Sequence, residues 1–124
     1  MDFKKPIIYE LDDIKLIEFD KKNIKIIGLK SGVYFLFDEN VNVLYIGKSI
    51  DLKQRISQHI RGVVPQSRNM IHEIKWFGYI SRAKLPIHLS LNKCENMHIC
   101  KYKPLLNNYY KSNQHIDFTA CDGW

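Results

Sequence analysis

Residues 32–47 read GVYFLFDENVNVLYIG, and this stretch decides the fold. Two runs within it, 33–37 and 41–46, are rich in β-branched and aromatic side chains, which favour β-strands. The polar residues 38–40 between them are typical of a turn. The stretch therefore predicts a β-hairpin. Because both faces of this hairpin are largely apolar, we expect the sheet to be covered on each side.

The register of the hairpin depends on the length of its turn. If Glu39 and Asn40 form a two-residue loop, Tyr34 lies directly opposite Tyr45 on the same face of the sheet. A three-residue loop would break this register. The opposition of the two tyrosines is therefore a prediction that depends on the shorter loop.

The segment after the hairpin predicts a helix over residues 52–61, which either Ser49 or Asp51 can cap. Aliphatic residues spaced by four form one row of this helix. Arg55 and His59 are also four apart, so they share a neighbouring row. The sequence thus predicts that two polar groups lie side by side on one helix, close to the end of the hairpin.

Further along the chain, the pattern predicts a third strand and a second long helix. Residues 66–73 suggest a short helix, and residues 74–81 are typical of a strand. Ser90 can cap a helix over residues 91–101, which stops before Pro104 because proline and the residue before it do not continue a helix. The order of elements is therefore two strands, helices, a strand and a helix.

The length of 124 residues fits one compact domain. We interpret residues 31–110 as the folded domain, residues 1–30 as an N-terminal extension or arm, and residues 111–124 as a polar tail. Within the arm, residues 14–19 and 24–27 each predict either a short strand or a packed segment.

Composition and charge narrow the classes of partner. Hydrophobic residues make up 45% of the chain, which is enough to build a core. The net charge of +6 favours anionic partners such as nucleic acid or an acidic membrane surface. There is no signal-peptide pattern at the start and no apolar run of the roughly 18 residues that a membrane span needs. The three cysteines are odd in number and form no C-x-x-C pair, so we expect reduced thiols in a cytoplasmic protein.

Three sequence motifs make the chain resemble the GIY-YIG nuclease family. They are GVY at 32–34, YIGK at 45–48 and LxxRxxxH at 52–59. Glu95, followed by Pro104 and Asn107, is similar to the C-terminal element of that family, and the resemblance covers roughly residues 31–108. It implies a GIY-YIG-like α/β (α+β) fold, in which helices flank a three-stranded antiparallel sheet. It also implies hydrolysis of DNA with one divalent metal ion, magnesium or manganese.

The residue types of these motifs suit phosphodiester hydrolysis. Magnesium prefers oxygen ligands and keeps several waters, so the carboxylate of Glu95 plus a substrate phosphate can suffice to bind it. Arg55 can grip two phosphate oxygens and neutralise developing charge. His59, one turn later, could orient the phosphate or move a proton. The alternatives are a solvated glutamate, an exposed arginine and a polar surface histidine.

The tyrosines need a cation to act as bases, because the pKa of tyrosine is ordinarily near 10. Lys48 could supply that positive charge, and so could a bound metal. The resemblance implies that Tyr34 helps to deprotonate the attacking water and that Tyr45 positions water or phosphate. The alternative for both is core packing in the hairpin. Asn107 is similar to a family residue that holds the active-site loop, and its alternative is a turn asparagine beside Asn108.

These motifs lead to a metal-dependent DNA endonuclease as the main interpretation, with Arg55 and Glu95 on opposite sides of the phosphate. DNA contacts are expected from Lys48, Arg55, Lys53 and Arg61. The alternative is a non-catalytic nucleic-acid-binding module with the same fold, which would not need a metal-ligand carboxylate facing the phosphate. No second DNA-binding module is visible, so specificity could come from an accessory protein or from self-association.

Overall fold

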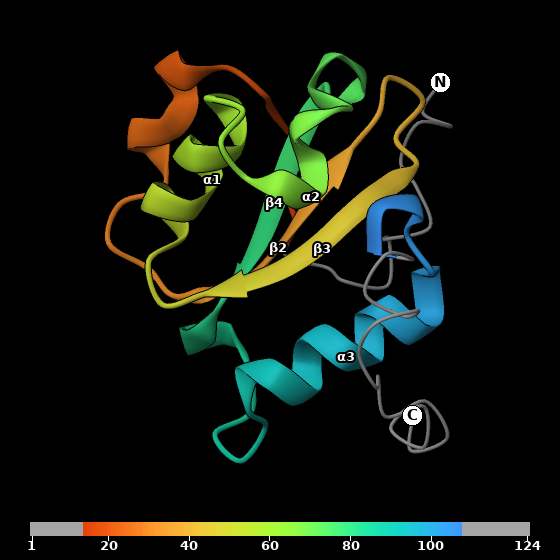
Figure 1. The fold of residues 1–124 in the computed structure, drawn as a ribbon. Helices are drawn as coiled ribbons and strands as arrows, with labels where there is room; N and C mark the ends of the chain where they lie inside the picture. The colour runs from red at the N-terminus through yellow and green to blue at the C-terminus, as the bar shows by residue number, and fades with distance from the viewer. Residues whose placement is uncertain (1–13, 108–124) are drawn as a thin grey trace, which may run out of the picture.

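The computed structural model describes residues 14–107, and they form a β-sheet between two helical layers (Figure 1). The four strands are antiparallel to their neighbours and lie in the order β1-β4-β2-β3. They are β1 (Ile17–Glu18), β2 (Gly32–Phe37), β3 (Val43–Ser49) and β4 (Trp76–Ser81). The expected three-stranded antiparallel sheet flanked by helices is confirmed. The N-terminal arm adds the short strand β1 at its edge.

Helices cover both faces of this sheet. The α-helices are α1 (Leu52–Ile60), α2 (Pro65–Arg68) and α3 (Leu91–Tyr102). The 3₁₀ turns are η2 (Lys21–Ile26), η3 (Ile71–Glu73), η4 (Arg82–Lys84) and η5 (Leu105–Asn107). Helix α1 packs on one face, and α3 crosses the other (Figure 1).

Successive side chains of β2 alternate between two hydrophobic cores, as the pleat of a strand requires. Tyr34 and Leu36 pack in the core that includes α1, whereas Val33 and Phe35 pack in the core that includes α3. All six residues of β2 are buried. The prediction that the hairpin is covered on both faces is therefore confirmed.

The turn between β2 and β3 is longer than the two-residue loop considered above. The backbone N–H of Asp38 donates to the carbonyl of Asn42 at 3.0 Å. The Asp38 carboxylate accepts hydrogen bonds from the N–H groups of Asn40 and Asn42. Val41 takes a left-handed conformation with φ of 64°. Three residues therefore separate Asp38 from Asn42, and the aspartate side chain stabilises this longer turn.

The longer turn, with a register shift between Leu36 and Phe37, changes the pairing of the tyrosines. Tyr34 pairs with Gly47, and Tyr45 pairs with Leu36. The predicted direct opposition of Tyr34 and Tyr45 is therefore wrong. Tyr45 lies two residues before Gly47, the partner of Tyr34, and side chains two residues apart on a strand point to the same face. The two tyrosines are therefore diagonal neighbours on one face of the sheet.

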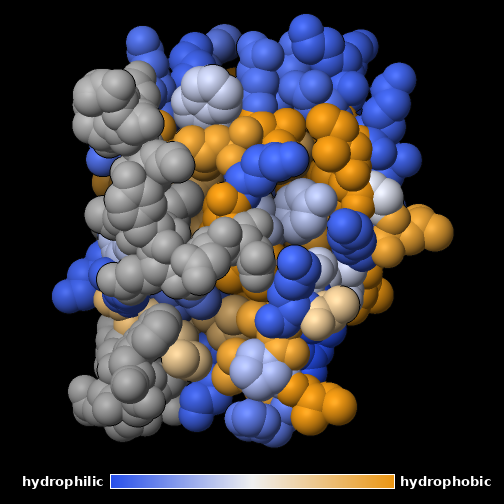
Figure 2. All heavy atoms as spheres, turned by 180° about the vertical axis from the view of Figure 1, so that it is seen from behind, coloured by the Kyte–Doolittle hydropathy of each residue, from blue (hydrophilic) through white to orange (hydrophobic). Residues whose placement is uncertain are grey.

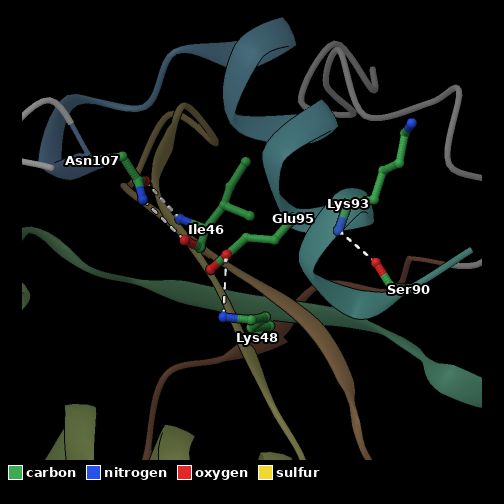
Figure 3. Close-up of polar contacts among 6 residues, drawn as sticks. All are labelled: Ile46, Lys48, Ser90, Lys93, Glu95 and Asn107. Atoms are coloured by element: carbon green, nitrogen blue, oxygen red, sulfur yellow. Dashed lines mark hydrogen bonds and ion pairs between the residues drawn. The ribbon is translucent and has the colours of Figure 1, made fainter. Parts of the chain in front are cut away.

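Helices α1 and α3 begin at capped positions. The Asp51 carboxylate accepts a hydrogen bond from the N–H of Gln54 at 3.1 Å, and the Ser90 hydroxyl accepts one from the N–H of Lys93 at 3.0 Å (Figure 3). The hydroxyl of Ser49 bonds to the backbone of Asp51 instead. Asp51 is thus the cap of α1, and the predicted starts of both helices are confirmed.

The arm is packed against the domain. Residues 24–27 fall at the end of η2 and its C-cap, so the strand alternative for them is wrong, while Ile24 and Ile27 are buried in the core with α1. Ile17 in β1 is also part of this core. This segment forms a 3₁₀ turn and not a strand because the Asp20 carboxylate caps the turn by accepting a hydrogen bond from the N–H of Lys22.

Three further features of the described residues concern helix hydropathy, the hydrophobic surface and the cysteines. Among the described residues, no helix has the length and apolar character that a membrane crossing requires. Hydrophobic residues do gather in the middle of one face, beneath a hydrophilic rim (Figure 2). Cys94 is a free, buried thiol, whereas Cys100 is disulfide-bonded. The expectation of three reduced thiols is therefore wrong, because sequence spacing does not show which distant thiols meet.

Candidate active site

The α1 face of the sheet holds a buried hydrogen bond between Tyr34 and His59. Tyr34 Oη and His59 Nε2 are 2.8 Å apart, and both side chains are 0% exposed. His59 faces the sheet because it continues the inner row of α1 formed by Leu52 and Ile56. The alternative of a polar surface histidine is therefore wrong.

Burial shifts the pKa values of both partners. It raises the pKa of Tyr34 well above its usual value; the positive charge of Arg55 opposes this shift, and the negative charge of Glu95 adds to it. Burial lowers the pKa of His59 to about 3, and the charge of Arg55 lowers it further. At neutral pH, Tyr34 is therefore a phenol and His59 a neutral imidazole. The cation that lowers the pKa of Tyr34 in this structure is Arg55, which the sequence reasoning did not name for this role beside Lys48 and a bound metal.

Tyr45 lies beside this pair and completes a cluster of three rings. Its centroid is 6.0 Å from that of Tyr34 and 5.3 Å from that of His59. Gly47 makes the arrangement possible, because a Cβ at this position would lie 2.5 Å from Cζ of Tyr34. Only glycine leaves room for the Tyr34 ring across the edge strand.

Arg55 lies on the flank of α1, next to the row that contains His59. Its guanidinium is half-buried and donates from Nη1 to Oε1 of Gln58 at 3.1 Å. The positive charge of this group acts to lower the pKa values of both Tyr34 and His59. Arg55 therefore lies at the boundary between the buried tyrosine and solvent.

The α3 face of the same strand carries an ion pair between Lys48 and Glu95. Lys48 Nζ lies 3.7 Å from Oε1 of Glu95, and Figure 3 shows the carboxylate reaching from α3 toward the lysine on β3. The Glu95 side chain is only 16% exposed. Burial raises its pKa, and the ammonium of Lys48 opposes that shift. The alternative of a freely solvated glutamate is therefore wrong.

Asn107 holds the outer edge of β3. Its Oδ1 accepts a hydrogen bond from the N–H of Ile46 at 2.9 Å, and its Nδ2 donates to the Ile46 carbonyl at 3.0 Å (Figure 3). The side chain is 1% exposed. The turn-asparagine alternative is thus excluded. Asn107 fixes the strand directly before Gly47 and Lys48.

Comparison with known proteins identifies the family. A sequence model of the UvrC-like GIY-YIG domain matches residues 30–108. The chain belongs to this family. The match begins after β1 and η2, so residues 14–29 of the arm fall outside it.

Individual relatives of this GIY-YIG domain are named UvrABC system protein C. The one from Caldicellulosiruptor saccharolyticus is 41% identical over 51 residues, which cover 40% of this chain and 9% of that protein. The one from Acetivibrio thermocellus is 36% identical over 63 residues, which cover 48% and 10%. The one from Ruminiclostridium cellulolyticum is 30% identical over 101 residues, which cover 79% and 16%. The chain thus spans 16% or less of the length of these relatives.

Two predicted DNA-binding residues of the GIY-YIG domain do not converge with the others. Lys53 and Arg61 are exposed. They lie two and six residues from Arg55, and such positions fall on different sides of a helix with 3.6 residues per turn. The structure therefore brings Arg55 and His59 together on α1, and Lys48 and Glu95 together across β3 and α3, but leaves Lys53 and Arg61 apart from them.

One buried side chain of this GIY-YIG domain was missed by the sequence reasoning. Ser67 in α2 is 0% exposed, and its Oγ lies 2.6 Å from Nδ1 of His59. Pro65 at the start of α2 was a usable signal for a helix, but no periodicity in four residues shows which side faces inward. Gln58, the partner of Arg55, was also missed, although its position three residues later on the same helix permitted the contact.

Proposed function

We propose that this domain is a metal-dependent endonuclease that hydrolyses phosphodiester bonds in DNA. One observation carries the proposal: two groups of polar side chains meet at consecutive residues of β3. Tyr34 reaches across Gly47 from the α1 face, and Glu95 contacts Lys48 from the α3 face. A phosphate at this edge could therefore meet a water-activating group on one side and a metal-binding group on the other.

Glu95 is the residue that would hold the metal. A partly buried carboxylate is one oxygen ligand of the kind that Mg²⁺ or Mn²⁺ accepts, with waters and the substrate phosphate completing the shell. The bound ion would supply charge for the phosphate and lower the pKa of its water. Burial raises the pKa of Glu95, so a nearby positive charge is needed to stabilise the ionised carboxylate. Lys48 supplies that charge in this structure. With Glu95 holding the ion, Lys48 would be available to contact the phosphate.

Tyr34 is proposed to receive the proton of the attacking water. Since burial keeps it a phenol at neutral pH, it must first lose its own proton, and positive charge at the site makes that easier. The water O–H bond then breaks, the proton moves to Tyr34 Oη, and the hydroxide oxygen forms a bond to phosphorus. The P–O bond of the ester breaks, and its oxygen leaves with the electron pair and takes a proton from solvent. Arg55 neutralises the charge that develops on the phosphate oxygens, and Tyr45 positions the water.

Target choice is proposed to depend on a partner protein or on a second copy of the chain. The relatives carry the name of a multi-part system, UvrABC, and this chain matches only a small share of their length. Lys53 on α1 and Arg61 at its C-cap lie on other sides than Arg55, so they extend the positive surface without adding to one compact patch.

The direct test is cleavage of supercoiled plasmid and of branched DNA with Mg²⁺, followed by addition of EDTA. The wild type should cut only while the metal is present. Glu95→Gln keeps the side-chain shape and should bind DNA without cutting it, whereas Glu73→Gln, at an exposed position on η3, should cut normally. Equal cutting by Glu95→Gln and wild type would exclude Glu95 as the metal ligand. DNA binding without cleavage by the wild type would identify a non-catalytic module.

A further inference from the structure

A chain of hydrogen bonds runs from Tyr34 through His59 to Ser67, inside the domain. Tyr34 Oη is 2.8 Å from Nε2 of the imidazole, and Ser67 Oγ is 2.6 Å from Nδ1. All three side chains are 0% exposed. The chain links β2, α1 and α2, and it ends on the hydroxyl that the proposed function assigns to water activation.

The imidazole in the middle carries one proton, because burial lowers the pKa of His59 to about 3. Two arrangements are then possible. If Nδ1 carries the proton, it donates to Ser67, and Nε2 accepts from the Tyr34 hydroxyl. If Nε2 carries the proton, it donates to Tyr34 Oη, and Nδ1 accepts from the Ser67 hydroxyl. The distances fit both arrangements.

The hydroxyl of Ser67 decides between them. In the described part of the chain, His59 is the one hydrogen-bond partner of Ser67 Oγ. If Oγ accepted from Nδ1, its own proton would be buried without an acceptor, and buried donors are rarely left in that state. The Ser67 proton therefore goes to Nδ1, and the ring proton of His59 sits on Nε2. The phenol proton of Tyr34, unlike the Ser67 proton, has a second hydrogen-bonding neighbour in Tyr45.

We propose that Ser67 is a positioning residue, which holds His59 in the tautomer that donates from Nε2 to the oxygen of Tyr34. The proposal rests on the proposed function in one respect, that the oxygen of Tyr34 acts on water. It gives the histidine a definite role. A donor aimed at the tyrosine oxygen stabilises the phenolate form, which is the form able to take a proton from water.

The same tautomer excludes His59 as the acceptor of the Tyr34 proton. Its Nε2 already carries hydrogen, and the lone pair on Nδ1 is occupied by Ser67. When Tyr34 ionises, its proton must therefore leave by a route other than His59. His59 acts by donating one hydrogen bond and does not change its charge.

The first test measures the tautomer without DNA or metal. Nitrogen-15 NMR of the histidine side chains in the full chain should show His59 protonated at Nε2. In Ser67→Ala, Nδ1 loses its donor, and the Nδ1-protonated form should appear. In Ser57→Ala, a change on α1 outside the hydrogen-bond chain, the wild-type pattern should persist. Protonation at Nδ1 in the wild type would overturn the proposal, and this measurement needs no variant to fold. An unchanged tautomer in Ser67→Ala would overturn it as well.

The second test measures the pH dependence of DNA cleavage. Loss of the donor to Tyr34 should raise the pKa of its hydroxyl and move the rising limb of the profile to higher pH by about one unit, or about tenfold in rate at a fixed pH. Arg55, Tyr45 and Glu95 also act on Tyr34 and are unchanged in Ser67→Ala. A changed tautomer with an unmoved limb would refute the positioning role. If the wild type cuts no DNA, the proposed function fails, but the tautomer measurement still stands.

Discussion

Replacement of Asn107 by alanine should destabilise the domain far more than loss of a surface asparagine. The Asn107 amide satisfies both backbone groups of Ile46, at 2.9 and 3.0 Å, and is 1% exposed. Because β3 is the last strand of the sheet formed by residues 14–107, no strand among these residues pairs with Ile46 on that side. Alanine would leave one N–H and one carbonyl buried without partners.

The size of the effect follows from these two groups. A buried polar group left without a partner costs about 1–3 kcal/mol, so two cost about 2–6 kcal/mol. A domain of this kind is stable by about 5–15 kcal/mol in total. The change should therefore remove a large part of the stability and lower the melting temperature by roughly 4 °C for each kcal/mol lost.

The measurement is urea denaturation of the wild type, Asn107→Ala and a matched control. Asn92→Ala, at an exposed position on α3, should change the free energy of unfolding by less than about 0.5 kcal/mol. Asn107→Asp should also be destabilised, because a carboxylate cannot donate to the Ile46 carbonyl. Hydrogen exchange at the Ile46 amide should accelerate in Asn107→Ala, which removes the acceptor of this N–H. If Asn107→Ala were as stable as Asn92→Ala, the view that this amide anchors β3 would have to be abandoned.

Three further predictions concern the residues near β3. Arg55→Ala should lower the cleavage rate by several powers of ten, and Arg55→Lys should restore only part of it, because lysine cannot grip two oxygens. Full activity of the lysine variant would show that charge alone is enough. Tyr34→Phe should change the free energy of unfolding by roughly 1 kcal/mol while cleavage falls much further; the opposite pattern would indicate a packing role. Between about pH 6.5 and pH 3, the unfolded chain binds a proton at His59 that the folded chain does not. The free energy of unfolding should therefore decrease as the pH decreases, by up to about 1.4 kcal/mol per pH unit in this window. A His59→Phe variant with the same slope would disprove this assignment to His59.

The sequence predicted those features that depend on neighbouring residues. The hairpin strands, the capped starts of α1 and α3 and the placement of Arg55 beside His59 all follow from local patterns. The hairpin register did not follow, because it depended on the Asp38 carboxylate closing a longer turn. The burial of His59 was present in the helix periodicity, since it lies three residues after Ile56 on the inner side, but its polar side chain concealed the pattern.

The pairings across the site could not be read from spacing. Lys48 meets Glu95 only because α3 crosses the sheet beside β3. Ser67 meets His59 because the chain reverses between α1 and α2, with Gly62 in a left-handed conformation. Such contacts are set by tertiary packing. The order of motifs along the chain indicates the fold, but it does not specify which side chains meet.

The arm shows that the part of the chain matched by the family model is smaller than the part that builds the core. The family match begins at residue 30, yet Ile17, Ile24 and Ile27 belong to the core, and β1 pairs with β4. A protein trimmed to the matched residues would expose apolar surface and leave β4 as an open strand edge. Open edges recruit strands from other molecules, so such a fragment should aggregate. Solubility in this domain thus depends on a segment that carries none of the catalytic motifs.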